Sequence, residues 1–116
     1  MKTIILNHKS YLSYNEITNY KEKINNIQSK NINLVLMPNL AYLSLFKDSK
    51  VKIGAQNFYS YNYGSYTGEI PLEILKSLNI NYTLVGHPER ITLQLDTYEE
   101  IKEKLYRSLN SGFKTI

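Results

Sequence analysis

The 116-residue chain contains no cysteine and no tryptophan, and only five glycines and three prolines. Without cysteine, neither a disulfide framework nor a thiolate zinc site can form. No repeat or low-complexity linker interrupts the chain, and 42% of its residues are hydrophobic, which is enough for one buried core. We therefore expect a single domain over residues 1–116. The eleven tyrosines accompany a general excess of Asn, Lys and Ile, which indicates a compositional bias rather than a function.

A long hydrophobic run is also missing from the N-terminus. Ile4, Ile5 and Leu6 form its one unbroken apolar run, which is too short for a signal peptide or a bilayer span. We therefore expect a cytoplasmic protein with no membrane segment. The net charge of +4 comes from dispersed lysines with no recognition motif beside them, so we expect no nucleic-acid partner.

Short apolar runs alternate with amphipathic segments along the chain. The apolar runs are typical of buried strands, which we expect over residues 3–6, 32–37, 51–56 and 82–85 and from residue 113 onward. Helices are expected after a capping box at Ser13 and Glu16, fraying near residues 29–31, then over 40–46, after Pro71, after Pro88, and from Asp96 to Leu109. This alternation predicts an α/β fold of right-handed βαβ units with a parallel sheet.

The last of these helices has apolar residues at Ile101, Leu105, Tyr106 and Leu109, which are its predicted core-facing positions. Gly112 follows as the predicted C-terminal cap.

Polar residues gather where the expected strands end. They are residues 7–9, 38–39, 56–57 and 87–90. In parallel α/β sheets, ligands and catalytic groups collect at the C-terminal ends of the strands. The pattern therefore predicts a functional site at this edge of the sheet.

His87 precedes Pro88, and a proline at the first helical position predicts that a short helix begins there. The positive end of a helix disfavours an imidazolium, so we expect a neutral ring that can polarise an oxyanion or give it a proton. A lone Gly-His-Pro is more often a simple helix cap, and only its combination with other signals favours catalysis.

The other candidates are individually weak. Lys9 at a strand end could balance the charge of a phosphate or enediolate, although an isolated lysine is more often solvated. Glu89 and Arg90 could shape the site or form an exposed pair of little energetic value. The tyrosine-rich loop over residues 58–66 could dock on a partner or fold over its own surface.

Four motifs join these candidates: Asn7-x-Lys9, Gly54-Ala55-Gln56-Asn57, Gly64-x-Tyr66-Thr67-Gly68-Glu69 and Gly86-His87-Pro88-Glu89-Arg90. Their order and spacing resemble the N-terminal half of the triosephosphate isomerase family, over essentially the whole chain. The resemblance implies about four βα units and the start of strand five of a (β/α)₈ barrel, a half-barrel. It also implies the interconversion of dihydroxyacetone phosphate and glyceraldehyde 3-phosphate through an enediolate, a step of glycolysis and gluconeogenesis, without metal or organic cofactor.

The resemblance assigns roles to the site residues. Asn7 would contact substrate and orient Lys9, whose charge would serve the substrate phosphate and the enediolate. His87 would be the neutral electrophile, a role for which triosephosphate isomerase is itself the standard example. Glu89 would form the polar network around Lys9 and take part in proton shuttling.

The resemblance also implies a homodimer. The loop from Phe58 to Glu69, which ends with Tyr66 and Thr67, would insert into a second subunit. Thr67 would approach the second subunit's Asn7 and Lys9, and Glu69 would face its Arg90. A complementing C-terminal half is the alternative partner.

The chain departs from the family pattern in two ways. It has His8, Ser10 and Pro88 where the family usually has tryptophan, methionine and serine, and Pro88 leaves the amide of Glu89 free to bond the ring of His87. The family's general base, lid and later phosphate-binding amides follow the sixth strand, in a barrel of about 250 residues. Loss of a positioned base costs about 10²–10⁴-fold in rate, so we expect these 116 residues alone to be a very poor isomerase.

Two hypotheses about the chain remain. The chain is a fragment or one of two assembling chains of an isomerase, with open strand edges that favour self-association. Alternatively, its strands close as a compact, doubly wound sheet that serves as a non-catalytic module for binding phosphate or protein.

Overall fold

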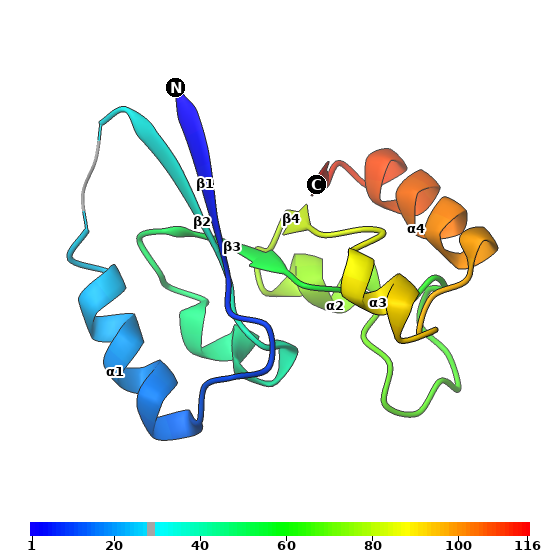
Figure 1. Ribbon diagram of the computed structural model, residues 1–116, viewed down its shortest axis with the longest axis horizontal. Coiled ribbons are helices and arrows are strands. Elements are labelled where there is room, and N and C mark those ends of the chain that lie inside the picture. The colour runs from blue at the N-terminus through cyan, green and yellow to red at the C-terminus, as the bar shows by residue number, and fades with distance from the viewer. Residues whose placement is uncertain (28–29) are drawn as a thin grey trace.

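Five parallel strands form the sheet of the computed structural model, which describes residues 1–27 and 30–116 (Figure 1). They are β1 (Lys2–Asn7), β2 (Ile32–Met37), β3 (Lys52–Ala55), β4 (Tyr82–Thr83) and β5 (Lys114–Thr115). Their spatial order is β1-β2-β3-β4-β5, and each neighbouring pair is parallel. The predicted half-barrel is therefore confirmed. A doubly wound sheet reverses its strand order at a switch point, so that alternative is wrong as a description of the fold.

Helical segments connect the strands. They are α1 (Tyr14–Ile24), the 3₁₀ helix η1 (Leu40–Phe46), α2 (Leu72–Ser77), α3 (Pro88–Thr92) and α4 (Tyr98–Asn110). Within residues 1–27 and 30–116, none of these helices is both long and apolar enough to cross a membrane.

Helix α1 begins as its sequence predicts and ends earlier than its periodicity suggests. The side chain of Ser13 accepts from the amide of Glu16, and the Glu16 carboxylate accepts from the amide of Ser13 at 2.8 Å, which confirms the capping box. The helix ends at Ile24, and Ile27 lies outside it with a largely exposed side chain. The fraying predicted near residues 29–31 falls partly on residues 28–29, outside the described residues.

Alternation along the strands divides their side chains between two faces of the sheet. One face packs on the helices, where Leu36 meets Ile17, Ile24 and Phe46 in one cluster, and Ala55 meets Leu75 and others in a second. The opposite face carries a separate cluster of Val35, Met37 and Tyr82, with Ile5 and Leu84 beside it. The core therefore lies mainly between the strands and the helices.

Gly54 marks a close approach on this second face. A Cβ atom at Gly54 would lie 2.7 Å from Cε of Met37 and 3.0 Å from Cβ of Tyr82. These distances are shorter than normal carbon contacts, so a Cβ atom here would force the end of Met37 to move and would crowd Tyr82.

Helix α4 buries a different stripe from the one predicted. Lys104 and Ser108 are buried, whereas Leu105, Tyr106 and Leu109 are exposed. The buried polar atoms have partners: the ammonium of Lys104 donates to Asn57 Oδ1 at 2.9 Å, and Thr115 Oγ1 donates to Ser108 Oγ at 2.8 Å. Partners supplied by other segments therefore decide which face of α4 packs inward.

Asp96 is the centre of a buried charge cluster. Its carboxylate accepts from Arg90 Nε at 2.8 Å, from Arg90 Nη2 at 3.1 Å and from Lys104 Nζ at 2.7 Å. Burial by itself would raise the pKa of Asp96, but hydrogen bonds and charges from Arg90 and Lys104 outweigh it and hold that pKa below its usual value. The cluster ties the end of α3 to α4.

The first prediction concerns Gly54. We expect Gly54→Ala to lower the free energy of unfolding by about 1–3 kcal/mol, because the added methyl group overpacks against Met37 and Tyr82. Chemical denaturation measures this change. Asn19→Ala, at an exposed position of α1, is the control and should leave the midpoint nearly unchanged. Equal midpoints for the two variants would contradict the packing argument.

The second prediction concerns Asp96. Asp96→Asn leaves Lys104 buried without its counter-charge, and we expect a loss of about 3–5 kcal/mol in unfolding free energy at pH 7. Because the folded pKa of Asp96 is depressed, its ionisation stabilises the protein above the unfolded pKa of about 3.9, and this contribution is lost as pH falls through the folded value. The asparagine variant should therefore lose stability less steeply below pH 4. Parallel acid-unfolding curves for both proteins would refute the assignment.

Candidate active site

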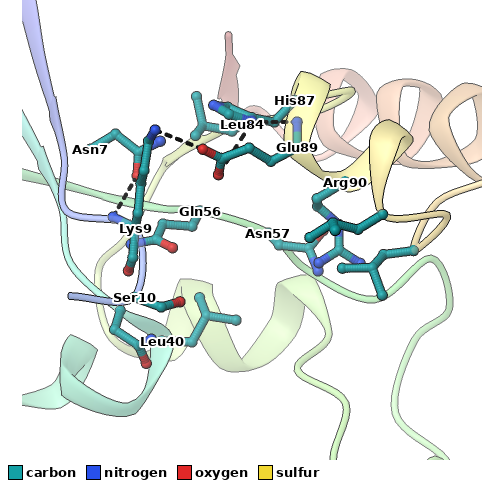
Figure 2. A pocket seen from close by; sticks show the side chains of 13 residues that line it. Asn7, Lys9, Ser10, Leu40, Gln56, Asn57, Leu84, His87, Glu89 and Arg90 are labelled. Atoms are coloured by element: carbon teal, nitrogen blue, oxygen red, sulfur yellow. Dashed lines mark hydrogen bonds and ion pairs between the residues drawn. The ribbon is translucent and has the colours of Figure 1, made fainter.

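A pocket of about 290 Å³ lies at the C-terminal edge of the strands (Figure 2). Polar residues that follow four different strands line it, namely Asn7, Lys9, Asn39, Gln56, Asn57, His87 and Glu89. The polar strand-end residues singled out from the sequence therefore converge on one pocket, and its functional role stays a prediction. Lys9, which follows β1, and His87, which follows β4, are far apart in sequence but face the same space (Figure 2).

The backbone around Lys9 holds an unfavourable conformation. Lys9 has a φ angle of 54°, in the left-handed region, which costs about 1–2 kcal/mol for a residue with a side chain. Two amide side chains support it: Asn7 Oδ1 accepts from the Lys9 amide at 3.0 Å, and Gln56 Nε2 donates to the Lys9 carbonyl at 2.9 Å. Gln56 also donates to the Met37 carbonyl at 3.0 Å, so it ties β2 to this turn. The ammonium of Lys9 is thereby directed into the pocket (Figure 2).

His87 caps α3, and Pro88 occupies the first turn, as predicted. The Glu89 amide donates to Nδ1 of His87 at 3.1 Å. An accepting Nδ1 carries no proton, so the neutral tautomer that fits this contact holds its proton on Nε2. The expectation that Pro88 leaves the Glu89 amide free for His87 is confirmed.

Glu89 joins the lysine to the histidine. Its side-chain Oε1 lies 2.6 Å from Lys9 Nζ, and its backbone amide is the donor to His87 Nδ1, whereas its Oε2, 3.9 Å from that nitrogen, is too far away for a hydrogen bond. The hydrogen bond with Glu89 raises the pKa of Lys9, and the same bond lowers the pKa of Glu89, so both groups are charged at neutral pH. Both side chains are about half exposed, so the pair orients groups in the pocket more than it stabilises the fold.

Arg90 borders the pocket, but its guanidinium is engaged by Asp96. Its expected contact with Glu69 of a second subunit stays a prediction. Tyr66, Thr67 and Glu69 lie in the loop between β3 and α2, and none of them lines this pocket. Their expected interface role also stays a prediction.

Gln56 and Asn57 were predicted to lie at the functional edge without individual roles, and no role was predicted for Asp96 or Lys104. Gln56 and Asn57 follow a buried strand directly, which was the available signal. Lys104 lies four residues before Ser108, so a pair of polar residues on one face of α4 was visible in the sequence. The burial of Lys104 depends on its contact with Asp96, which lies outside α4, so the sequence of the helix alone does not predict it. Within residues 1–27 and 30–116, no three His, Asp or Glu side chains are placed to hold a metal ion.

The arrangement can stabilise negative charge on a bound molecule. An ammonium and an imidazole N–H that face one small pocket favour a developing oxyanion or an anionic group. Glu89 is the one carboxylate among the 13 described lining residues, and Lys9 holds it at 2.6 Å. The described part of the site therefore contains electrophilic groups and no uncommitted base.

Comparison with known proteins agrees with this geometry. The profile of the triosephosphate isomerase family matches residues 2–116. The chain is 38% identical over 113 residues to a triosephosphate isomerase of Wolbachia sp. subsp. Brugia malayi, covering 96% of this chain and 46% of that protein. It is 35% identical over 122 residues to that of Orientia tsutsugamushi, covering 97% and 48%. A third, from Colwellia psychrerythraea, is 31% identical over 96 residues, covering 76% and 38%.

The chain thus spans about half, or less, of the length of these curated relatives. The family match covers all five strands and all the residues that line the pocket, from Asn7 to Leu95. On these grounds the chain belongs to the triosephosphate isomerase family and corresponds to the N-terminal part of its members.

Proposed function

We propose that this chain supplies the electrophilic part of a triosephosphate isomerase site, which interconverts dihydroxyacetone phosphate and glyceraldehyde 3-phosphate. The observation that supports it most directly is the convergence of Lys9 and His87 on one pocket of about 290 Å³. A cytoplasmic location and a place in glycolysis belong to the same proposal.

The proposed chemistry follows from the geometry. Lys9 balances the negative charge of the substrate phosphate and of the enediolate, while the Nε2–H of His87 polarises the substrate carbonyl. Asn7 and Gln56 hold the turn that presents Lys9, and Glu89 fixes the ammonium through its carboxylate. Preorganised donors of this kind stabilise the charge that develops when a proton leaves carbon.

The proposal places the general base on additional polypeptide. Glu89 is the one carboxylate in the described lining, and its charge is committed to Lys9. A complementing C-terminal half would bring the base and close the pocket. A second copy of this chain would meet the loop from Phe58 to Glu69, in the proposed homodimer.

The third prediction tests this proposal through reconstitution. The chain alone should turn over glyceraldehyde 3-phosphate near the background rate. Addition of the C-terminal portion of the Orientia tsutsugamushi enzyme, from the end of the matched region, should restore turnover. In that assembly, His87→Gln and Lys9→Met should each reduce kcat/KM by about 10²-fold or more, because each removes a group that stabilises the developing charge.

Lys23→Ala, at an exposed position of α1, is the matched control and should retain full activity. Full activity of the unassisted chain would show that the base has been assigned wrongly. Phosphate binding that depends on Lys9, without turnover in any assembly, would favour the non-catalytic module instead.

The fourth prediction concerns the pair of Lys9 and Glu89. Glu89→Gln removes the carboxylate that raises the pKa of Lys9, so that pKa should fall toward its ordinary value. NMR titration of the lysine side-chain carbons measures the change. Glu99→Gln, in the exposed first turn of α4, is the control. An unshifted Lys9 in Glu89→Gln would mean that the contact is absent in solution.

A further inference from the structure

The loop between β3 and α2 is folded on itself by three tyrosines. The ring of Tyr66 stacks with that of Tyr61 at a centroid distance of 5.8 Å and an interplanar angle of 24°. Tyr59 lies 4.9 Å from Tyr66 and 5.6 Å from Tyr61, in tilted contacts. Aromatic pairs at these distances attract one another beyond their area of contact. The loop therefore contains a small aromatic cluster of Tyr59, Tyr61 and Tyr66. The residues around Tyr61 and Asn62 are called the tip of the loop.

The backbone accommodates this cluster at two places. The Tyr59 amide donates to the Ile70 carbonyl at 2.8 Å, which closes the base of the loop. A Cβ atom at Gly64 would lie 2.6 Å from Cε2 of Tyr66, so glycine makes room for the ring. Phe58, at the start of the loop, is buried in the core with Leu72 and Leu75. The base of the loop is thus anchored in the core, and Tyr59 connects it to the aromatic cluster.

Arg107 of α4 anchors the tip. Its Nη1 donates to Asn62 Oδ1 at 3.1 Å, and its guanidinium carbon lies 5.6 Å from the centroid of Tyr61, as in a cation–π contact. Its Nε donates to Glu103 Oε1 at 2.7 Å, which holds the guanidinium plane. Among the described residues, the contact with Asn62 is the one side-chain hydrogen bond between residues 58–69 and another element.

Helix α4, which carries Arg107, is itself held in place at two points. Thr97 and Glu100 form a capping box at its start, and Lys104 attaches its buried face to Asp96. Arg107 extends from the same helix, so the tip of the loop is tied to the charge cluster through one rigid element.

We propose that Arg107 is a positioning residue that holds loop 58–69 in one conformation before the loop docks on a second copy of this chain. The inference rests on the proposed homodimer. A loop that is ordered before association loses less conformational entropy when it docks, and its affinity is correspondingly higher. Tyr63 and Tyr66 remain 67% and 41% exposed, so aromatic surface is left for the partner after the cluster has formed.

A simpler role for Arg107 is an ordinary surface ion pair with Glu103, four residues before it in the helix. Such a pair contributes little and has no effect on a distant loop. The two roles make different predictions. If Arg107 holds the loop, its removal should increase hydrogen exchange around Tyr61 and Asn62. If it only pairs with Glu103, its removal should affect α4 alone.

The test combines hydrogen exchange of the dilute, monomeric chain with sedimentation measurement of the dimer. For Arg107→Ala, we expect exchange in residues 59–69 to rise about tenfold, exchange in α4 to stay the same, and the dimer dissociation constant to rise by a similar factor. Arg107→Lys keeps the charge near Tyr61 but not the planar fork, so it should rescue in part. Lys102→Ala, exposed on the same helix, is the matched control and should change neither quantity.

A double-mutant cycle with Tyr61→Ala gives the sharper result. If Arg107 acts through Tyr61, the double variant should be little worse than either single variant. Unchanged loop exchange in Arg107→Ala, or faster exchange with unchanged dimer affinity, would overturn the proposal. A wild-type chain that stays monomeric at every concentration would overturn the homodimer and the docking step with it, whereas the exchange measurement tests the ordering of the loop separately.

Discussion

Parallel pairing of consecutive strands is the constraint on which the site depends. In such a sheet all C-terminal strand ends reach the same edge, so residues that are distant in sequence become neighbours. The pairing of Asn7 with Met37 at the end of β1 and β2 continues into the turn, where the His8 amide donates to the Met37 carbonyl at 3.0 Å. Gln56 then joins the same carbonyl to the turn that presents Lys9. The sheet therefore determines both the place and the direction of the lysine.

Two charge clusters with different physical roles flank this edge. The pair of Lys9 and Glu89 is about half exposed, so water screens it and its value lies in the orientation of groups in the pocket. The cluster of Arg90, Asp96 and Lys104 is largely buried, so the loss of one charge would leave another buried without its counter-charge and would destabilise the fold. Adjacent residues, Glu89 and Arg90, thus belong to separate systems, one facing the pocket and one joining α3 to α4.

The outer surface shows where further polypeptide could pack. Leu105, Tyr106 and Leu109 are exposed on α4, and β1 and β5 each have one neighbour in the described sheet. Unpaired strand edges and exposed apolar side chains favour association with another chain or segment. Self-association of the isolated chain stays a prediction, and so does its completion by a second half.

Features that depend on local interactions could be predicted from the amino-acid sequence alone. The strand runs, the capping box of Ser13 and Glu16, and the contact between the Glu89 amide and His87 all involve residues a few positions apart, and each was predicted. The polar residues at the strand ends were enough to predict the edge that holds the site, whereas the half-barrel was predicted from the resemblance of the motifs to a known family.

Features whose interaction partners lie far apart in sequence depend on the fold and could not be predicted from local patterns. Apolar periodicity placed Leu105 and Leu109 inward, yet α4 buries Lys104 and Ser108, because Asp96, Asn57 and Thr115 satisfy their polar atoms. The left-handed turn at Lys9 persists because Gln56, from another strand end, supports its carbonyl. A buried charge or a strained turn is stable only with partners in place, and the fold, not the local pattern, brings those partners together.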